Sequence, residues 1–407
     1  MKVLVLNCGS SSLKFKLMET SLRQMKIDAD VEIAKGLVEK IGLPGAEVHY
    51  YDNKGNYHHE VTSILNHREA LSKCVSLLQD EKIGVLKSKS EIDAIGHRVV
   101  HGGEYFSESV VIDSKVINVI QECARFAPLH NPHNLEGIRV AMEFFPNVPN
   151  VAAFDTQFHH TIPPQAYLYA IPTYFYYRDG IRRYGFHGLS HCYITYRFSR
   201  LIEKPAEEVK LISCHLGNGS SITAVKNGKS VDTSMGFTPL EGLVMGTRCG
   251  DIDPEVVIYI MARENLSISE TSSLLNKQSG LLGLSGISND MRHILEEADK
   301  GNLQCKYAFE VFSYRVKKYI SAYLGVLNGV DGIVFTAGIG ENSYRVREKA
   351  ISGLENLGVK LDPERNREAI GKEMEISTPD SRVKVWVIPT NEELVIARDT
   401  VKVLSKQ

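Results

Sequence analysis

Two short segments of one design occur in this chain, and they constrain its fold more than any other feature. The first is VLVLNCGSSSLKFKLM near the start, and the second is LISCHLGNGSSITAVKNG, which begins at residue 211. Each places a turn rich in glycine and serine between two apolar runs, which is typical of a β-hairpin. Two hairpins of one design predict a duplicated fold, with a cleft between two related halves.

Short apolar runs alternate with amphipathic patterns along the rest of the chain. The expected strands are 3–6, 13–18, 92–95, 151–154, 211–214, 221–225, 332–336 and 383–388, and the expected helices are 67–79, 116–126, 135–145, 254–263, 303–327 and 391–404. The helix at 254 has the clearest start, because Asp253 suits the N-cap and Pro254 the first helical position. Strands and helices mixed in this order predict an α/β architecture.

Length and composition exclude several classes of protein. The 407 residues suffice for two or three domains, and the formal charge of -2 gives no basis for a nucleic-acid or basic membrane-binding surface. No apolar run reaches the roughly 18 residues of a membrane span, and the short apolar start predicts no signal peptide. The seven cysteines lack Cys-x-x-Cys spacing, which suits reduced thiols in a cytoplasm better than a disulfide framework or a cysteine zinc site.

Three glycine-rich turns are candidates for binding phosphate. Residues 7–14 (NCGSSSLK) and 215–221 (HLGNGSS) offer unobstructed backbone N–H groups and hydroxyls, and Lys14 adds a positive charge. Each is also compatible with an ordinary hairpin turn, although the occurrence of two favours phosphate. Residues 335–342 (FTAGIGEN) lead from a strand into Gly-x-Gly and a helix start; this pattern alone is weak evidence for a nucleotide.

Several charged residues stand where an active site could use them. Arg98 and Arg248 are flanked by glycine-containing segments, and Asp155 follows a predicted buried strand. Residues 182–191 (RRYGFHGLSH) combine cations, aromatic rings and glycines. A solvated turn, or an N-cap for the aspartate, remains the alternative in each case. Together with the phosphate turns, this set suits phosphoryl transfer from a nucleotide with Mg²⁺.

At these residues the sequence resembles the acetate kinase family, within the superfamily of sugar kinases, heat-shock ATPases and actin. The resemblance covers nearly the whole chain. It is carried by NCGSSSLK at 7–14, GHRVVHGG at 96–103, PLHNP at 128–132, FDTQFH at 154–159, RRYGFHG at 182–188, CHLGNGSS at 214–221, DTSMGFTPLEGLVMGTRCGDIDP at 232–254, FTAGIGEN at 335–342 and PTNEE at 389–393.

The resemblance implies a duplicated ribonuclease H-like (actin-like ATPase) fold, with two domains flanking a nucleotide cleft. Residues 1–156 plus 391–407 would form the N-terminal domain, with the first phosphate loop and the carboxylate site. Residues 157–390 would form the nucleotide-binding domain, with the second phosphate loop and the adenosine site.

The resemblance also implies a role for individual residues. The implied set is Asp155, His187 and Arg248 in catalysis; Arg98, Val100, Leu129, Phe186 and Pro239 at the substrate; Lys14, His215, Leu216, Gly217, Asn218, Gly219, Asp290, Met291, Arg292, Gly338, Ile339, Gly340, Glu341 and Asn342 at the nucleotide; and Asn7 and Glu392 at the metal. The implied cofactor is Mg²⁺, with Mn²⁺ as an alternative, and ATP/ADP is the co-substrate.

The activity implied by the resemblance is reversible phosphoryl transfer from ATP to acetate by a cytoplasmic homodimer, with a propionate or short-chain fatty acid kinase as the alternative. A small carboxylic acid is already ionised at pH 7, so it needs no general base. We therefore expect Asp155 to position an arginine or a metal-bound water. Two other activities are compatible with such a fold: an ATP-gated chaperone, which would need a further peptide-binding domain, and a phosphatase-like hydrolase.

Overall fold

The computed structural model describes residues 1–406, and the chain divides into two compact units. The first unit comprises Met1–Gln157 together with Asn391–Gln407, and the second comprises Phe158–Thr390. Each unit has its own sheet and its own hydrophobic core. Within the described residues, no helix is both long and apolar enough to cross a membrane.

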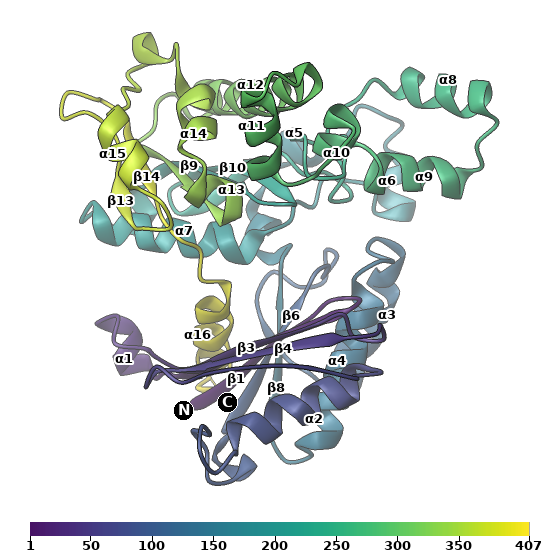
Figure 1. Ribbon diagram of the computed structural model, residues 1–407, viewed down its shortest axis with the longest axis vertical. Coiled ribbons are helices and arrows are strands. Elements are labelled where there is room, and N and C mark those ends of the chain that lie inside the picture. The colour runs from purple at the N-terminus through teal and green to yellow at the C-terminus, as the bar shows by residue number, and fades with distance from the viewer. Residues whose placement is uncertain (407) are drawn as a thin grey trace. The chain divides into compact units, whose positions relative to one another are not determined.

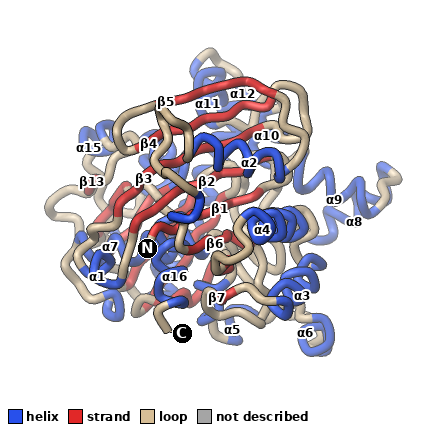
Figure 2. Tube along the Cα trace, turned by 90° about the horizontal axis from the view of Figure 1, so that it is seen from below, coloured by secondary structure: helices blue, strands red, loops and turns tan. Residues whose placement is uncertain are grey.

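The first unit is built on an eight-stranded sheet in the order β5-β4-β3-β2-β1-β6-β8-β7 (Figure 2). Its strands are β1 (Lys2–Cys8), β2 (Ser12–Glu19), β3 (Val31–Glu39), β4 (Ala46–Asp52), β5 (Tyr57–Thr62), β6 (Ala94–Val99), β7 (Val110–Val111) and β8 (Asn150–Phe154). Its helices are α1 (Leu22–Lys26), α2 (His67–Leu78), α3 (Ser114–Glu122), α4 (Asn131–Phe144) and α16 (Glu392–Leu404). The last helix returns to this unit from the far end of the sequence.

Helices cover both faces of this sheet (Figure 1). Successive side chains of β1 point to opposite faces, and those on both faces are apolar. Leu4 and Leu6 point into a core shared with α2 and α4. On the opposite face α16 packs closely, because a Cβ atom on Gly96 of β6 would collide with Ile396. Strands buried on both faces read as continuous apolar runs, as the sequence of β1 does.

The second unit is built on a six-stranded sheet in the order β11-β10-β9-β12-β14-β13. Its strands are β9 (Lys210–Leu216), β10 (Ser220–Lys226), β11 (Lys229–Thr233), β12 (Gly332–Thr336), β13 (Met374–Glu375) and β14 (Lys384–Val387). Its helices are α5 (Pro164–Tyr167), α6 (Tyr174–Asp179), α7 (Gly188–Leu201), α8 (Pro254–Glu264), α9 (Ile268–Lys277), α10 (Gly280–Ser285), α11 (Met291–Asp299), α12 (Leu303–Leu327), α13 (Ala337–Asn342), α14 (Tyr344–Ile351) and α15 (Pro363–Glu368).

Helices again cover both faces of the second sheet. The long helix α12 contributes Phe312, Val316 and Ile320 to a core with β9 and β12. On the other face, α7 packs Phe198 so tightly that a Cβ atom on Gly332 would collide with its ring. Glycine at this position therefore sets how closely the helix approaches the sheet.

The two sheets repeat one topology, and this confirms the duplicated α/β fold predicted from the two hairpins. In each unit a three-stranded antiparallel meander (β1-β2-β3 or β9-β10-β11) is followed by two strands parallel to its first strand (β6 and β8, or β12 and β14). An antiparallel edge strand, β7 or β13, completes each set. The first sheet adds β4 and β5 beyond the meander.

Several helix bounds agree with the sequence, because their caps are local. Asp253 caps α8 with Pro254 at its first position, and Asn391 caps α16. The expected helix over 116–126 is wrong in extent: α3 ends at Glu122, and Cys123–Arg125 form a 3-10 turn. The predicted strand at 92–95 lies two residues further on, so Arg98 belongs to β6 itself.

Candidate active site

The first phosphate-loop candidate is the turn between β1 and β2 in the first unit. Asn7 pairs with Lys14 across the hairpin, and the N–H of Gly9 donates to the carbonyl of Ser12 at 2.9 Å. The Nζ atom of Lys14 lies 2.5 Å from Oε1 of Glu393, in the first turn of α16. The side chain of Lys14 is about half exposed beside the turn.

Three further contacts, which the sequence analysis missed, fix the backbone of this turn. Nε2 of His67 contacts the carbonyl of Gly9 at 2.7 Å, and the N–H of Ile41 donates to the carbonyl of Ser11 at 3.0 Å. The buried amide of Asn134 donates to the carbonyl of Cys8 at 2.8 Å and accepts from the N–H of Val100 at 3.1 Å. Asn134 therefore ties the first phosphate loop to the segment after Arg98.

Arg98 and Asp155 form a bidentate ion pair at the ends of two neighbouring parallel strands. Nε of Arg98 donates to Oδ1 of Asp155 at 3.0 Å and Nη2 donates to Oδ2 at 2.6 Å. Glu392 lies beside them, with Oε2 3.8 Å from the same Nε. Burial alone would lower the pKa of Arg98, but the carboxylates of Asp155, Glu392 and Glu393 outweigh it and raise that pKa. Asp155 is thus engaged in fixing the direction of a guanidinium group.

The first unit also contains oxygen-bearing side chains that could hold a divalent cation. Asn7 ends its side chain in an amide oxygen, and Glu392 in a carboxylate at the N-terminal end of α16, a helix that packs against β1. Buried Asp155 adds a second carboxylate beside Glu392, through their shared neighbour Arg98. Hard oxygen donors of this kind are what Mg²⁺ prefers, so the residues present fit a magnesium ion.

An imidazole and a guanidinium group lie at the β9–β10 turn in the second unit. The turn is closed by a hydrogen bond from the N–H of Gly217 to the carbonyl of Gly219 at 3.0 Å. A Cβ atom on Gly219 would lie 3.3 Å from Cε1 and Nε2 of His187 and 3.7 Å from Nη1 of Arg248. The imidazole and the guanidinium therefore converge on this glycine, and a larger side chain there would separate them from the loop.

Arg248 differs from Arg98 in having no acidic partner within residues 1–406. Its Nη1 donates to the carbonyl of Pro239 at 3.2 Å, and burial lowers its pKa because no carboxylate compensates for the lost water. A partly buried cation held only by neutral groups is prepared to receive an anion.

The orientation of His187 is set by a chain of polar side chains. His187 is the N-cap residue of α7 and has a left-handed conformation (φ 55°), and its Nδ1 lies 3.0 Å from Oγ of Ser221. That hydroxyl also contacts Nε2 of buried His191 at 2.8 Å. The ring of His187 stacks on His215, with centroids 4.1 Å apart, and Nδ1 of His215 contacts Ser190. These contacts leave Nε2 of His187 directed toward Gly219.

A cavity of about 560 Å³ in the second unit joins three of the predicted nucleotide segments. Its lining includes Gly217 and Asn218, the start of α11 at Asp290–Arg292, and Gly338, Ile339 and Asn342 of α13. Further lining residues, which the sequence analysis did not single out, are Asn289, Leu295, Ser343, Tyr344 and Arg345. Glycine at 338 faces open space, since a Cβ atom there would meet nothing within 4 Å.

Leu216, Gly340 and Glu341 were also expected at the nucleotide, but they are not among the residues that line this cavity. Leu216 is fully buried in the core, so only its backbone can contribute. Oε1 of Glu341 accepts from the N–H groups of Ala337 at 2.7 Å and Thr390 at 3.1 Å. Arg347, which is fully buried, donates to the carbonyls of Gly340 and Glu341 at 2.8 and 2.9 Å. These contacts fix the position of α13. The sequence alone does not distinguish Arg347 from an arginine on the surface of a helix.

The residues expected around the substrate methyl group divide between the units. Val100 is buried immediately after β6, and Leu129 in the same unit is 55% exposed. Phe186 is buried in the second unit, where its carbonyl contacts His159, and Pro239 lies against Arg248. Val100 therefore lies two residues after Arg98, Pro239 contacts Arg248, and Phe186 immediately precedes His187.

The chain is similar to known proteins over nearly its whole length. The sequence profile of the Acetokinase family matches residues 2–398. The chain is 55% identical to the acetate kinase of Halothermothrix orenii over 404 residues, covering 99% of this chain and all of that protein. It is 55% identical to the acetate kinase of Thermotoga maritima over 409 residues, covering 100% of this chain and 99% of that one.

Solved structures resemble the fold over nearly its whole length. The crystal structure of Porphyromonas gingivalis acetate kinase superposes with a TM-score of 0.92 at 45% identity, covering 99% of each chain. A propionate kinase from Francisella tularensis superposes with a TM-score of 0.90 at 42% identity, covering 98% of this chain and 99% of that one. The chain is therefore a member of the acetokinase family.

Proposed function

We propose that this protein is an ATP-dependent acetate kinase that reversibly converts acetate and ATP into acetyl phosphate and ADP. The observation that carries the proposal is the convergence of His187 and Arg248 on the turn at Gly219, in the unit whose cavity joins the three nucleotide segments. Family membership gives the fold, and these two hydrogen-bond donors at a phosphate turn would supply the chemistry. The full-length acetate kinases at 55% identity support acetate as the acceptor.

The reaction needs an anion to approach a polyanion. One carboxylate oxygen of acetate attacks the γ-phosphorus, and the bond from that phosphorus to the β,γ-bridging oxygen breaks. The bonding electrons leave with ADP, and no proton is transferred. Arg98, held by Asp155, would bind the substrate carboxylate, while Arg248 and His187 would stabilise the moving phosphoryl group. Catalysis of this kind is mostly positioning and neutralisation of charge.

Asn7 and Glu392 would hold Mg²⁺, or Mn²⁺ in its place, and the bound ion supplies charge that offsets the repulsion between the two substrates. Lys14 would face the nucleotide phosphates from the first loop, although Glu393 partly neutralises it. The adenosine would occupy the cavity between α11 and α13. The cysteine usage supports a cytoplasmic location.

The proposal is tested most simply in the reverse direction. Purified protein mixed with acetyl phosphate, ADP and Mg²⁺ should produce ATP, measured by luciferase light output. Omitting acetyl phosphate should abolish the signal, and carbamoyl phosphate serves as a control for other acyl phosphates. Failure to form ATP from acetyl phosphate would contradict the proposed activity.

Propionate is the second candidate acceptor, and Val100 is the residue to examine. We expect Val100→Ala to raise the ratio of kcat/KM for propionate over acetate about tenfold, because a methylene in an apolar pocket contributes about 1–3 kcal/mol. The hydrogen bond from the N–H of Val100 to Asn134 does not involve the side chain, so the loop should persist. The measurement is acyl phosphate formation across acids from formate to butyrate.

The matched control is Val110→Ala, the same truncation on β7. It should leave the acid preference of the enzyme unchanged. An unaltered preference in Val100→Ala would remove this residue from the proposed substrate pocket.

We further propose that the enzyme is a homodimer through its second unit. Helix α8 contains eleven residues and none is buried, although Val256, Ile258 and Tyr259 are apolar and 42–60% exposed. On α12, Tyr307 and Tyr314 are also exposed and lie on one helix face. Apolar groups exposed together are typical of an interface.

We expect Ile258→Asp to convert the dimer to a monomer, because a charge in an apolar interface loses its water without gaining a partner. Light scattering after size exclusion measures the mass. Leu43→Asp, at an exposed apolar site in the first unit, should remain dimeric. A wild-type monomer, or a dimer unaffected by Ile258→Asp, would argue against this interface.

A further inference from the structure

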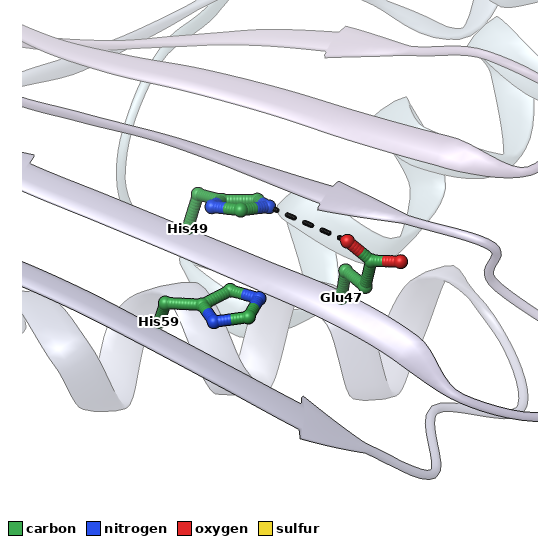
Figure 3. A group of neighbouring side chains, drawn as sticks. All are labelled: Glu47, His49 and His59. Atoms are coloured by element: carbon green, nitrogen blue, oxygen red, sulfur yellow. Dashed lines mark ion pairs between the residues drawn. The ribbon is translucent and has the colours of Figure 1, made fainter.

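Three metal-ligating side chains meet on the exposed face of β4 and β5 in the first sheet, and none of them belongs to the sites assigned above (Figure 3). Glu47 and His49 lie two residues apart on β4, so they share a face, and His59 on β5 is the cross-strand partner of His49. The opposite face of β4 carries buried Ala46, Val48 and Tyr50. The pattern of the strand therefore presents Glu47 and His49 outward.

The geometry points to a binding site for a divalent transition metal, formed by Glu47, His49 and His59. One ligand atom from each side chain lies within 4.8 Å of the other two. Nε2 of His49 is 3.8 Å from Oε2 of Glu47, and the two imidazole rings are stacked with centroids 4.6 Å apart. Ligands of a tetrahedral zinc ion stand about 3.4 Å apart, so small side-chain rotations complete the site.

The ligand set selects the class of metal. Two imidazoles and a carboxylate suit Zn²⁺, Cu²⁺ or Ni²⁺, whereas Mg²⁺ prefers oxygen ligands alone. Three protein ligands leave a fourth position of a tetrahedral ion to water. The site thus differs in chemistry from the oxygen ligands at Asn7 and Glu392.

Neighbouring groups already orient two of the ligands. Nδ1 of His49 lies 3.2 Å from the hydroxyl of Tyr57; when Nδ1–H donates to that hydroxyl, Nε2 presents its lone pair toward Glu47. Lys40 contacts the other carboxylate oxygen, Oε1 of Glu47, at 2.5 Å. This hydrogen bond, with the charge of Lys40, lowers the pKa of Glu47 and keeps the carboxylate ionised.

Metal binding here would join an edge strand to its neighbour. β5 is the outermost strand of the sheet, and none of its six residues is fully buried. An ion held by His49 on β4 and His59 on β5 adds a cross-strand link on the exposed face. Because the complete site exists only in the folded sheet, the metal should stabilise the native state.

The test is titration of untagged protein with Zn²⁺ by calorimetry, in excess Mg²⁺ to occupy the oxygen sites. We expect one zinc ion per chain, with affinity reduced at least about tenfold in His59→Ala and His49→Ala. His58→Ala is the matched control: His58 is adjacent in sequence, lies on the opposite face and pairs with Glu60 at 2.9 Å. It should bind zinc as the wild type does.

A second readout separates ligand loss from misfolding. His59 is exposed, so His59→Ala should unfold at the wild-type temperature when no metal is present. Zinc should then raise the unfolding temperature of the wild type and His58→Ala, but not of His59→Ala. Wild-type protein that binds no zinc at micromolar concentrations, or equal binding by His59→Ala, would overturn the proposal. Equal losses in His58→Ala and His59→Ala would also overturn it.

Discussion

Replacing Arg248 by alanine should lower kcat by about 10²–10³-fold while leaving the fold intact. The guanidinium lies beside Gly219 and has no carboxylate partner within the described residues, so its charge is available to the phosphoryl group in the transition state. Nη1 of Arg248 donates a hydrogen bond to the neutral carbonyl of Pro239. Removing the side chain therefore leaves no buried carboxylate without its ion-pair partner. Steady-state kinetics and a thermal unfolding curve measure the two effects.

Arg200→Ala is the matched control, because Arg200 is an exposed arginine of the same unit near the end of α7. It should retain wild-type turnover. Lysine at 248 should restore only part of the rate, since its point charge lacks the planar fork of a guanidinium. Near-normal turnover of Arg248→Ala would refute the assigned role.

Arg98→Ala is a less clear test of whether an arginine contributes to catalysis. The change would leave Asp155, which is 1% exposed, without its bidentate partner. Breaking a buried pair in this way costs about 3–5 kcal/mol. A loss of activity in Arg98→Ala would therefore combine lost substrate binding with lost stability, whereas Arg248→Ala separates them.

The protein should lose stability steeply as the pH falls from about 6.5 toward 4. Burial lowers the pKa of His97 and His159 to about 4 and that of His101 to about 3, and it lowers the pKa of His191 well below its ordinary value. In the unfolded chain these groups titrate near 6.5. Between those values the unfolded state binds more protons, so each histidine removes about 1 kcal/mol of stability per pH unit.

The measurement is the urea midpoint of unfolding at several pH values between 7.5 and 5. The urea midpoint should fall steadily as the pH is lowered from 6.5 to 5. In His97→Gln it should fall less per pH unit, because one titrating group has been removed. The exposed His293→Gln should leave the slope unchanged. A midpoint that stays constant from pH 6.5 to 5 would show that the buried histidines do not control acid stability.

Local sequence chemistry predicted the parts of the fold that depend on near neighbours. The two Gly/Ser turns indicated the β1–β2 and β9–β10 hairpins, and the caps at Asp253 and Asn391 indicated α8 and α16. The strands β3, β4 and β5 were not predicted, because polar residues alternate with apolar ones along them and leave no long continuous apolar run. Each of these strands pairs antiparallel with the strand before it, so the missed signal was local alternation and not a long-range contact.

The same distinction applies to the candidate site. Arg98 and Asp155 were singled out separately, but their bidentate pair depends on β6 and β8 being neighbours in the sheet. Asn134 was missed because an asparagine inside a helix carries no signal of its contact with Cys8. His49 and His59 likewise meet only through the register of β4 and β5.

The central claim is that a carboxylate accepts the phosphoryl group directly from ATP. Forward reactions with ATP, Mg²⁺, acetate and hydroxylamine trap acetyl phosphate as acetyl hydroxamate, which is measured beside ADP. The account predicts equimolar hydroxamate and ADP, and almost no ADP when acetate is omitted. ADP formation at the same rate without acetate, and without hydroxamate, would contradict it and identify the protein as a hydrolase.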